Sequence, residues 1–176
     1  MSLSTGDKKF AIITAIVAVL FVVIVGGSVA ALTVGHESSD VPYLQVANGS
    51  ELVRVEPLIY CDIDGTDCEG SLDDPPTRVP VAVGDTAMIS LSDDLAIGPW
   101  TVVVQYLTAD GFDTGTETFY GSDTRRVITL TSTEDKILAA VEIRQPSQVE
   151  VEGQFVPRGV WGLDTLPDGV EVPAAA

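Results

Sequence analysis

One uncharged stretch, residues 10–34, constrains this chain more than any other feature. It reads FAIITAIVAVLFVVIVGGSVAALTV and contains no Asp, Glu, Lys or Arg. As a helix rising about 1.5 Å per residue it would be roughly 37 Å long, which is enough to cross about 30 Å of hydrocarbon with some tilt. The stretch therefore predicts a single transmembrane helix over residues 10–34.

The charges that flank this stretch predict its orientation. Lys8 and Lys9 stand just before it, and no Lys or Arg follows until Arg54. Because basic residues gather on the cytoplasmic side of a span, we expect a single-pass plasma-membrane protein with a cytoplasmic N-terminus and an extracytoplasmic remainder. The expected segments are the N-terminus at 1–9, the helix at 10–34, a tether at 35–41, a folded domain at 42–168 and a disordered tail at 169–176.

A cleaved signal peptide is the alternative interpretation of the same stretch. Ser28-Val29-Ala30, followed by Ala31, resembles a cleavage site of small residues. However, the apolar run is longer than the usual signal core of about 7–15 residues, and it continues past the site to Val34. No cysteine lies near its end, so a lipid-modified N-terminus is not expected. We therefore favour an uncleaved anchor.

The outer part of the chain is strongly acidic. The sequence has 26 acidic and nine basic residues, a net charge of −17, and Asp7 is the only acidic residue before Glu37. Such a surface repels nucleic acid and anionic lipid headgroups and favours solubility. We therefore expect no nucleic-acid partner. The acidic surface is either a solvated exterior or a face that docks onto a basic partner.

Two cysteines, Cys61 and Cys68, enclose the acidic stretch DIDGTD. Outside the membrane the environment is oxidising, so the pair is expected to form a disulfide. Asp62, Asp64 and Asp67 also suggest a calcium site. An EF-hand loop that began at Asp62 would need Gly where Asp67 stands and Glu where Asp73 stands, so a regular EF-hand is excluded and an irregular calcium site stays open.

From Pro42 onward, short apolar runs are separated by Gly, Pro, Asn and Asp. Strands at this spacing predict an all-β, immunoglobulin-like antiparallel β-sandwich without an amphipathic helix. The Val-rich run at 99–107 should be central and buried on both faces. The expected strands are 43–46, 51–60, 78–83, 86–91, 99–107, 125–130, 136–144, 148–153 and 154–163. The expected core is Trp100, Val102, Val104, Ile128, Leu130, Ile137, Val141 and Trp161.

The residues do not indicate catalysis. The one histidine, His36, lies in the predicted tether, where no folded core can position it. Zinc and haem sites need clusters of His or Cys that this chain lacks, so no cofactor is expected. Acidic pairs such as Asp73 and Asp74 arise by chance in so acidic a chain, and a carboxylate enzyme is only the third hypothesis. Asn48-Gly49-Ser50 matches a glycosylation sequon, but we interpret it as a hairpin turn.

One face of the predicted helix is rich in small residues. Such faces let helices approach closely in lipid, so this one is a candidate for packing against another membrane protein. The alternative is that Ala and Gly are simply common in membrane helices. The residues of the candidate packing face are Ala11, Ala15, Ala18, Val22, Gly26 and Ala30.

Four motifs carry a resemblance to a known family. LIYCDIDGTDC, IGPWTVVVQYL, VEIRQ and FVPRGVWGL, which span roughly residues 50–165, resemble a family of uncharacterised actinobacterial envelope proteins. Many of its members are lipoproteins or single-anchor proteins of bacteria that contain mycolic acids. This chain lacks the lipidation cysteine, so its helix would provide the anchor. The family offers no catalytic residues to carry over.

In size and layout the chain also resembles small accessory subunits of the actinobacterial cytochrome bcc–oxidase supercomplex. This likeness implies a non-catalytic role in electron transport, in which the helix docks on integral membrane subunits and the acidic outer domain covers part of the complex. The second hypothesis is an envelope module that binds or transports a lipid or glycolipid between its two sheets. A large apolar cavity in the sandwich would favour the second hypothesis, and a well-packed sandwich would favour the first.

The uncleaved anchor makes a direct prediction. Intact-mass spectrometry of the protein extracted from membranes should give the mass of a chain that retains residues 10–34. A mature chain that begins at Ala31 would overturn the anchor and leave the outer domain as a secreted protein.

Overall fold

The computed structural model describes residues 41–113 and 115–170. The predicted transmembrane helix, its candidate packing face and most of the predicted tether lie outside these residues. No helix within the two described ranges is long and apolar enough to cross a membrane.

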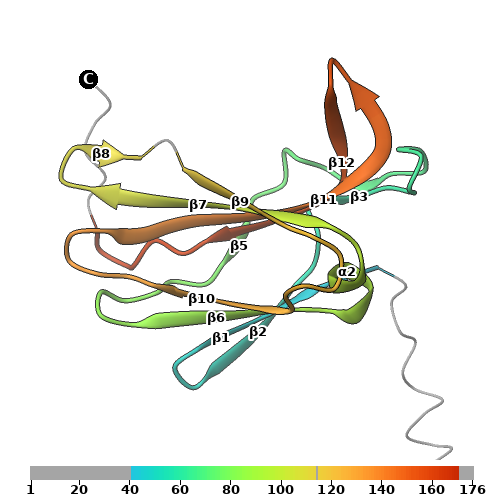
Figure 1. The fold of residues 1–176 in the computed structure, drawn as a ribbon. Coiled ribbons are helices and arrows are strands. Elements are labelled where there is room, and N and C mark those ends of the chain that lie inside the picture. The colour runs from blue at the N-terminus through green and yellow to red at the C-terminus, as the bar shows by residue number, and fades with distance from the viewer. Residues whose placement is uncertain (1–40, 114, 171–176) are drawn as a thin grey trace, which may run out of the picture. The chain divides into compact units, whose positions relative to one another are not determined.

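The described chain forms two β-sheets that face each other (Figure 1). The small sheet has four antiparallel strands in the order β10 (Val127–Thr131), β6 (Thr86–Leu91), β1 (Leu44–Asn48) and β2 (Glu51–Val55). The large sheet runs in the order β4 (Glu69–Gly70), β3 (Ile59–Tyr60), β12 (Gln154–Asp164), β11 (Ile137–Val151), β7 (Trp100–Thr108) and β8 (Gly111–Phe112). In addition, β9 (Thr116–Tyr120) pairs with β7, and β5 (Thr77–Arg78) pairs with β12 in parallel.

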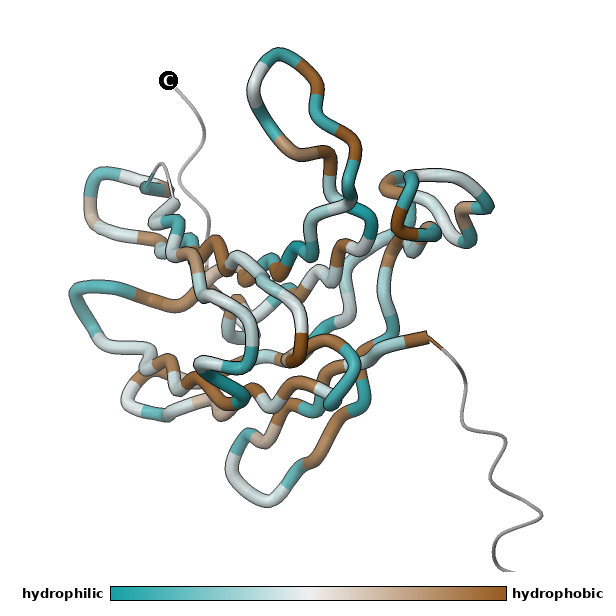
Figure 2. Tube along the Cα trace, turned by 45° about the vertical axis from the view of Figure 1, so that its right-hand side comes forward, coloured by the Kyte–Doolittle hydropathy of each residue, from teal (hydrophilic) through white to brown (hydrophobic). Residues whose placement is uncertain are grey.

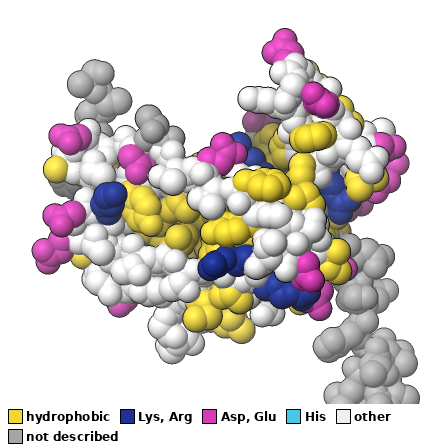
Figure 3. Space-filling model, viewed as in Figure 1, with side chains coloured by type: hydrophobic (Ala, Val, Ile, Leu, Met, Phe, Trp, Pro, Cys, Tyr) yellow, Lys and Arg dark blue, Asp and Glu magenta, His cyan; other side chains and the backbone are white. Residues whose placement is uncertain are grey.

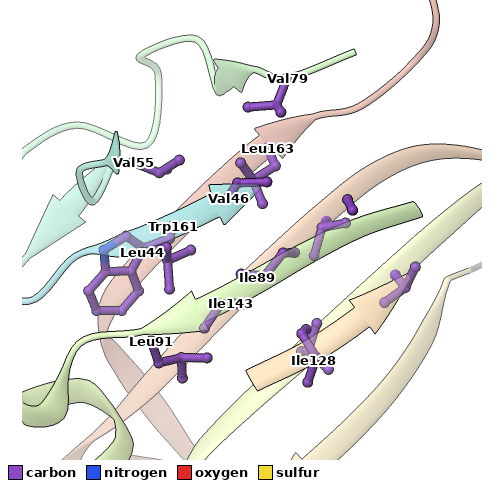
Figure 4. Close-up of a cluster of buried hydrophobic side chains, with 14 of the residues drawn as sticks. Leu44, Val46, Val55, Val79, Ile89, Leu91, Ile128, Ile143, Trp161 and Leu163 are labelled. Atoms are coloured by element: carbon purple, nitrogen blue, oxygen red, sulfur yellow. The ribbon is translucent and has the colours of Figure 1, made fainter. Parts of the chain in front are cut away.

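The core lies between the two sheets (Figure 4). Trp100 and Trp161 are fully buried, and aliphatic side chains from both sheets fill the space around them. The Trp161 indole N–H donates a hydrogen bond to the Pro42 carbonyl at 3.1 Å, which ties the start of the described chain to the large sheet. The aliphatic members at the centre of the core are Leu44, Val46, Val55, Val79, Ile89, Leu138, Ile143 and Leu163.

The prediction of an all-β chain with two packed sheets is confirmed, and the immunoglobulin-like topology stays a prediction. The strand expected at 86–91 agrees in both bounds with β6. The turn expected near Asn48 joins β1 to β2, with Asn48 paired to Glu51. Of the eight predicted core residues, six are buried, while Leu130 and Ile137 are half-buried.

Other expectations were wrong in detail. The predicted strand at 78–83 is reduced to β5, although beyond it Val79 and Val81 still donate their N–H groups to the Asp164 and Thr165 carbonyls at 2.8 and 2.9 Å. The strands predicted at 136–144 and 148–153 are one long strand, β11. A five-residue helix, α2 (Asp93–Ile97), was not predicted, because it is too short to show helical periodicity.

The central strand β7 is buried on one face only. Trp100, Val102 and Val104 point into the core, whereas Thr101 and Val103 between them are half-buried. The prediction of burial on both faces assumed a second covering layer. In this fold the outer face of β7 is covered only in part, and that leaves room for a groove.

The packing of the core can be tested at Ile143. This side chain is fully buried, so Ile143→Ala should lower the free energy of unfolding by about 2–5 kcal/mol. Urea unfolding of the full-length protein in detergent, followed by tryptophan fluorescence, measures the change. Leu52→Ala is the control, because Leu52 is 67% exposed and its loss should cost less than about 0.5 kcal/mol. Equal effects of the two variants would contradict this core.

Candidate functional site

The most distinctive local feature is a hairpin that leaves the plane of the large sheet. The pairing of β11 with β12 shifts register between Gln145 and Pro146, and again between Pro146 and Glu150. Such irregularities bend a strand, and a proline fits them because it has no N–H to donate. Residues 146–157, called the hairpin below, therefore rise away from the sheet (Figure 1). Apolar and polar residues alternate along it (Figure 2).

The disulfide loop braces the base of the hairpin. Cys61 and Cys68 are joined, as the sequence predicted. The Gln148 N–H donates to the Ile63 carbonyl at 2.8 Å, and the Cys61 N–H donates to the Arg158 carbonyl at 2.7 Å. Gly65 lies so near that an added Cβ would stand 3.2 Å from Val149 Cγ2. The loop is therefore a staple that supports the hairpin from one side.

Arg158 forms side-chain hydrogen bonds at the base of the hairpin. Its guanidinium donates to the Tyr60 hydroxyl, and its Nε donates to Gln145 Oε1 at 3.1 Å. Burial raises the pKa of Tyr60, and the adjacent Arg158 charge opposes this rise. Gln145 is itself buried, so its bond to Arg158 is partly shielded from water.

A groove lies between the hairpin and the outer face of the large sheet. Its floor is one row of cross-strand neighbours, in which Phe119 pairs with Thr101 and Thr101 pairs with Arg144. Its volume is about 490 Å³. The hairpin supplies its wall through Pro146, Gly153, Gln154, Phe155 and Pro157, and Glu117 completes the lining.

The groove combines exposed aromatic rings with carboxylates. Phe119 is 66% exposed and Phe155 is 62% exposed, which is unusual for side chains of this size. Arg144 forms an ion pair with Glu142, whereas Glu117 and the hairpin residue Glu152 form no ion pair within the described chain. Figure 3 shows hydrophobic side chains below the hairpin and acidic ones at its tip.

The suggested calcium set is not assembled. Among the residues that the structure describes, no group of three His, Cys, Asp or Glu side chains could hold a metal ion, so Asp62, Asp64 and Asp67 do not converge. Asp64 instead accepts hydrogen bonds from the side chain and the backbone N–H of Thr66, and these bonds lower its pKa. The acidic loop therefore uses its side chain oxygens to close its own turn.

The sequence predicted the disulfide but not the groove. Neither Phe119 nor Phe155 was predicted to line a site. The available signal was the stretch VEVEGQFV at residues 149–156, in which a Glu-Gly pair interrupts an alternating pattern and so indicates a hairpin turn, although not that the hairpin leaves the sheet. The residues of the candidate helix-packing face lie outside the described ranges, and their role stays a prediction.

Removal of the Cys61–Cys68 disulfide should make the hairpin less stable. The double variant Cys61→Ser/Cys68→Ser should lose about 2–3 kcal/mol of unfolding free energy, because the unfolded chain is no longer constrained. Amide hydrogen exchange should also speed up at Gln148 and Val149 more than at Met88 in the small sheet. Unchanged exchange in the hairpin would contradict the bracing role of the loop.

Comparison with known proteins gives a family but no activity. A family model described as "Protein of unknown function (DUF2771)" matches residues 37–166. No curated protein and no solved structure matches the chain. The matched range contains both sheets, the disulfide loop, the hairpin and the groove. The chain therefore belongs to the DUF2771 family.

Proposed function

We propose that this chain is a non-catalytic, membrane-anchored accessory subunit of a larger membrane complex. Residues 10–34 anchor it in the plasma membrane, with the N-terminus in the cytoplasm. The β-sandwich lies outside and contacts a partner protein through the groove below the hairpin.

The observation that supports this function most is the pair of exposed phenylalanines in the groove. Large aromatic side chains contribute much of the binding energy at protein interfaces, and their exposure in a free chain is costly. Phe119 comes from β9 and Phe155 from the hairpin, so two parts of the chain that are distant in sequence supply one apolar surface. A groove supported by a disulfide is well suited to receive a partner with little rearrangement.

The packing between the sheets weighs against the lipid-carrier hypothesis. That hypothesis places an acyl chain between the two sheets. The corresponding space is filled by Trp100, Trp161 and the aliphatic side chains around them. The groove, in contrast, is open to solvent and lined by both polar and apolar residues.

The groove lies at the end of the sandwich where the chain enters. Pro42 bonds to Trp161, whose strand continues into the hairpin, and Tyr43 bonds to Ser92 just before α2. A tether of seven residues, as predicted at 35–41, spans at most about 25 Å. Under this proposal, chain length alone therefore limits the distance between the predicted anchor and the start of the domain.

The resemblance to accessory subunits makes the cytochrome bcc–oxidase supercomplex the first partner to test. The full-length protein should be purified from native membranes in mild detergent, and the co-purified material examined by haem absorbance and mass spectrometry. We expect bcc and oxidase subunits in a constant ratio. Recovery of the chain alone, or with lipid-transport proteins, would contradict the assignment.

Variants of the groove test whether the co-purified membrane proteins bind there. Phe119→Ser/Phe155→Ser should lower partner recovery about fivefold or more, since exposed aromatic anchors dominate such interfaces. The matched control is Leu52→Ser/Phe112→Ser, which removes two exposed apolar side chains that do not line the groove. Equal recovery with both double variants would show that the groove is not the contact.

A further inference from the structure

We infer that the groove binds an extended segment of a partner protein in which apolar and basic side chains alternate. This inference rests on the proposed function and specifies the chemistry of the partner. It follows from the apolar anchors, the charge around them and the unpaired edge of β9.

The aromatic rings of the groove favour apolar side chains in the partner. Phe119 rises from the floor of the groove and Phe155 lies in its wall, with Pro146 and Pro157 beside them. A pocket of about 490 Å³ has room for a few side chains but not for a folded domain. A single chain segment that inserts apolar side chains therefore fits it best.

The charges around the groove favour basic side chains in the partner. Arg144 also lines the groove, but its charge is balanced by its ion pair with Glu142. Glu117 lines the groove as well, and Glu152 lies at the turn of the hairpin, next to Gly153 of the wall. Neither forms an ion pair with any residue of the described chain, and the sequence as a whole has a net charge of −17. A cation in the partner would pair with these carboxylates and could also stack on an exposed Phe ring.

The open sheet edge at β9 favours a partner segment in an extended conformation. β9 pairs with β7 and with no other strand of the described chain, so one side of β9 keeps its backbone groups free. An extended segment can add to such an edge through main-chain hydrogen bonds, while its side chains enter neighbouring pockets. A segment paired with this edge would run along the rim of the groove, where Phe119 and Glu117 lie on β9 itself, and the side chains of one of its faces would reach into the groove.

The same charge argues against other occupants. A second copy of this chain would bring a further net charge of −17 to the interface, and mutual repulsion opposes that association. Anionic lipid headgroups are repelled for the same reason. A basic, apolar segment of another protein is the occupant that both the surface and the charge favour.

Three fluorescein-labelled peptides of about ten residues, long enough to lie along one strand, test the inference. Leucine alternates with lysine in the first and with glutamate in the second, and serine alternates with lysine in the third. Their binding to the full-length protein in detergent is measured by fluorescence anisotropy. We expect the leucine–lysine peptide to bind at least about tenfold more tightly than the other two, and more weakly at high salt.

Variants then locate the binding. Phe119→Ser and Phe155→Ser should each weaken the leucine–lysine peptide about tenfold. Glu117→Gln should weaken it about threefold and reduce its salt dependence. Glu117 makes no side-chain bond within the described chain, so this variant keeps the fold even if an aromatic variant does not. Phe112→Ser, an exposed phenylalanine on the same sheet outside the groove, should leave the affinity unchanged.

Several results would overturn the inference. Equal affinity for the three peptides would contradict the preference for an apolar and basic segment. Equal effects of Phe119→Ser and Phe112→Ser would show that the peptide does not bind in the groove. A fluorescent fatty acid is the competing probe. If it binds with the same dependence on Phe119 and Phe155 while the peptides do not bind, the occupant is a lipid.

The peptide-binding experiment and the co-purification experiment can fail independently of each other. If the chain co-purifies with a membrane complex but the groove does not prefer the leucine–lysine peptide, this inference fails and the accessory role stands. If the peptide binds at the groove but no membrane complex is recovered, the accessory role fails and a peptide-binding module remains.

Discussion

The burial of Trp161 holds the described structure together at the end where the chain enters. Its indole bonds to the Pro42 carbonyl, and its ring lies 6.1 Å from that of Tyr60. A Cβ at Gly159 would stand 2.7 Å from the Trp161 ring, so only glycine fits there without displacing it. One side chain thus fixes the first strand, the large sheet and the strand that leads into the disulfide loop, and the hairpin emerges from this fixed point.

The position of the groove follows from that arrangement. Because β11 and β12 are anchored at their base by the core, by Arg158 and by the disulfide loop, their bulged continuation has to leave the sheet. Phe155 is carried outward with the hairpin and comes to line the same groove as Phe119 of β9. The cost of exposing two aromatic rings is understandable if a partner covers them, and this is the basis of the proposed accessory role.

The sequence predicted the elements that depend on local pattern. An apolar run between turn residues predicted β6, the Asn48–Gly49 turn predicted the first hairpin, and the two cysteines in an expected extracytoplasmic context predicted the disulfide. It did not predict features that depend on tertiary geometry. Nothing local indicates that β11 bends at Pro146, that Asp64 bonds to Thr66 rather than to a metal, or that Phe119 and Phe155 line one groove.

A photo-crosslinking amino acid at position 155 of the full-length chain, activated in native membranes, would capture whatever protein occupies the groove. We expect one dominant adduct, in which mass spectrometry identifies a segment of an integral membrane subunit with basic and apolar residues. The same amino acid at position 112 should not give that adduct. No adduct at position 155, or the same adducts from both positions, would contradict the groove as the docking site.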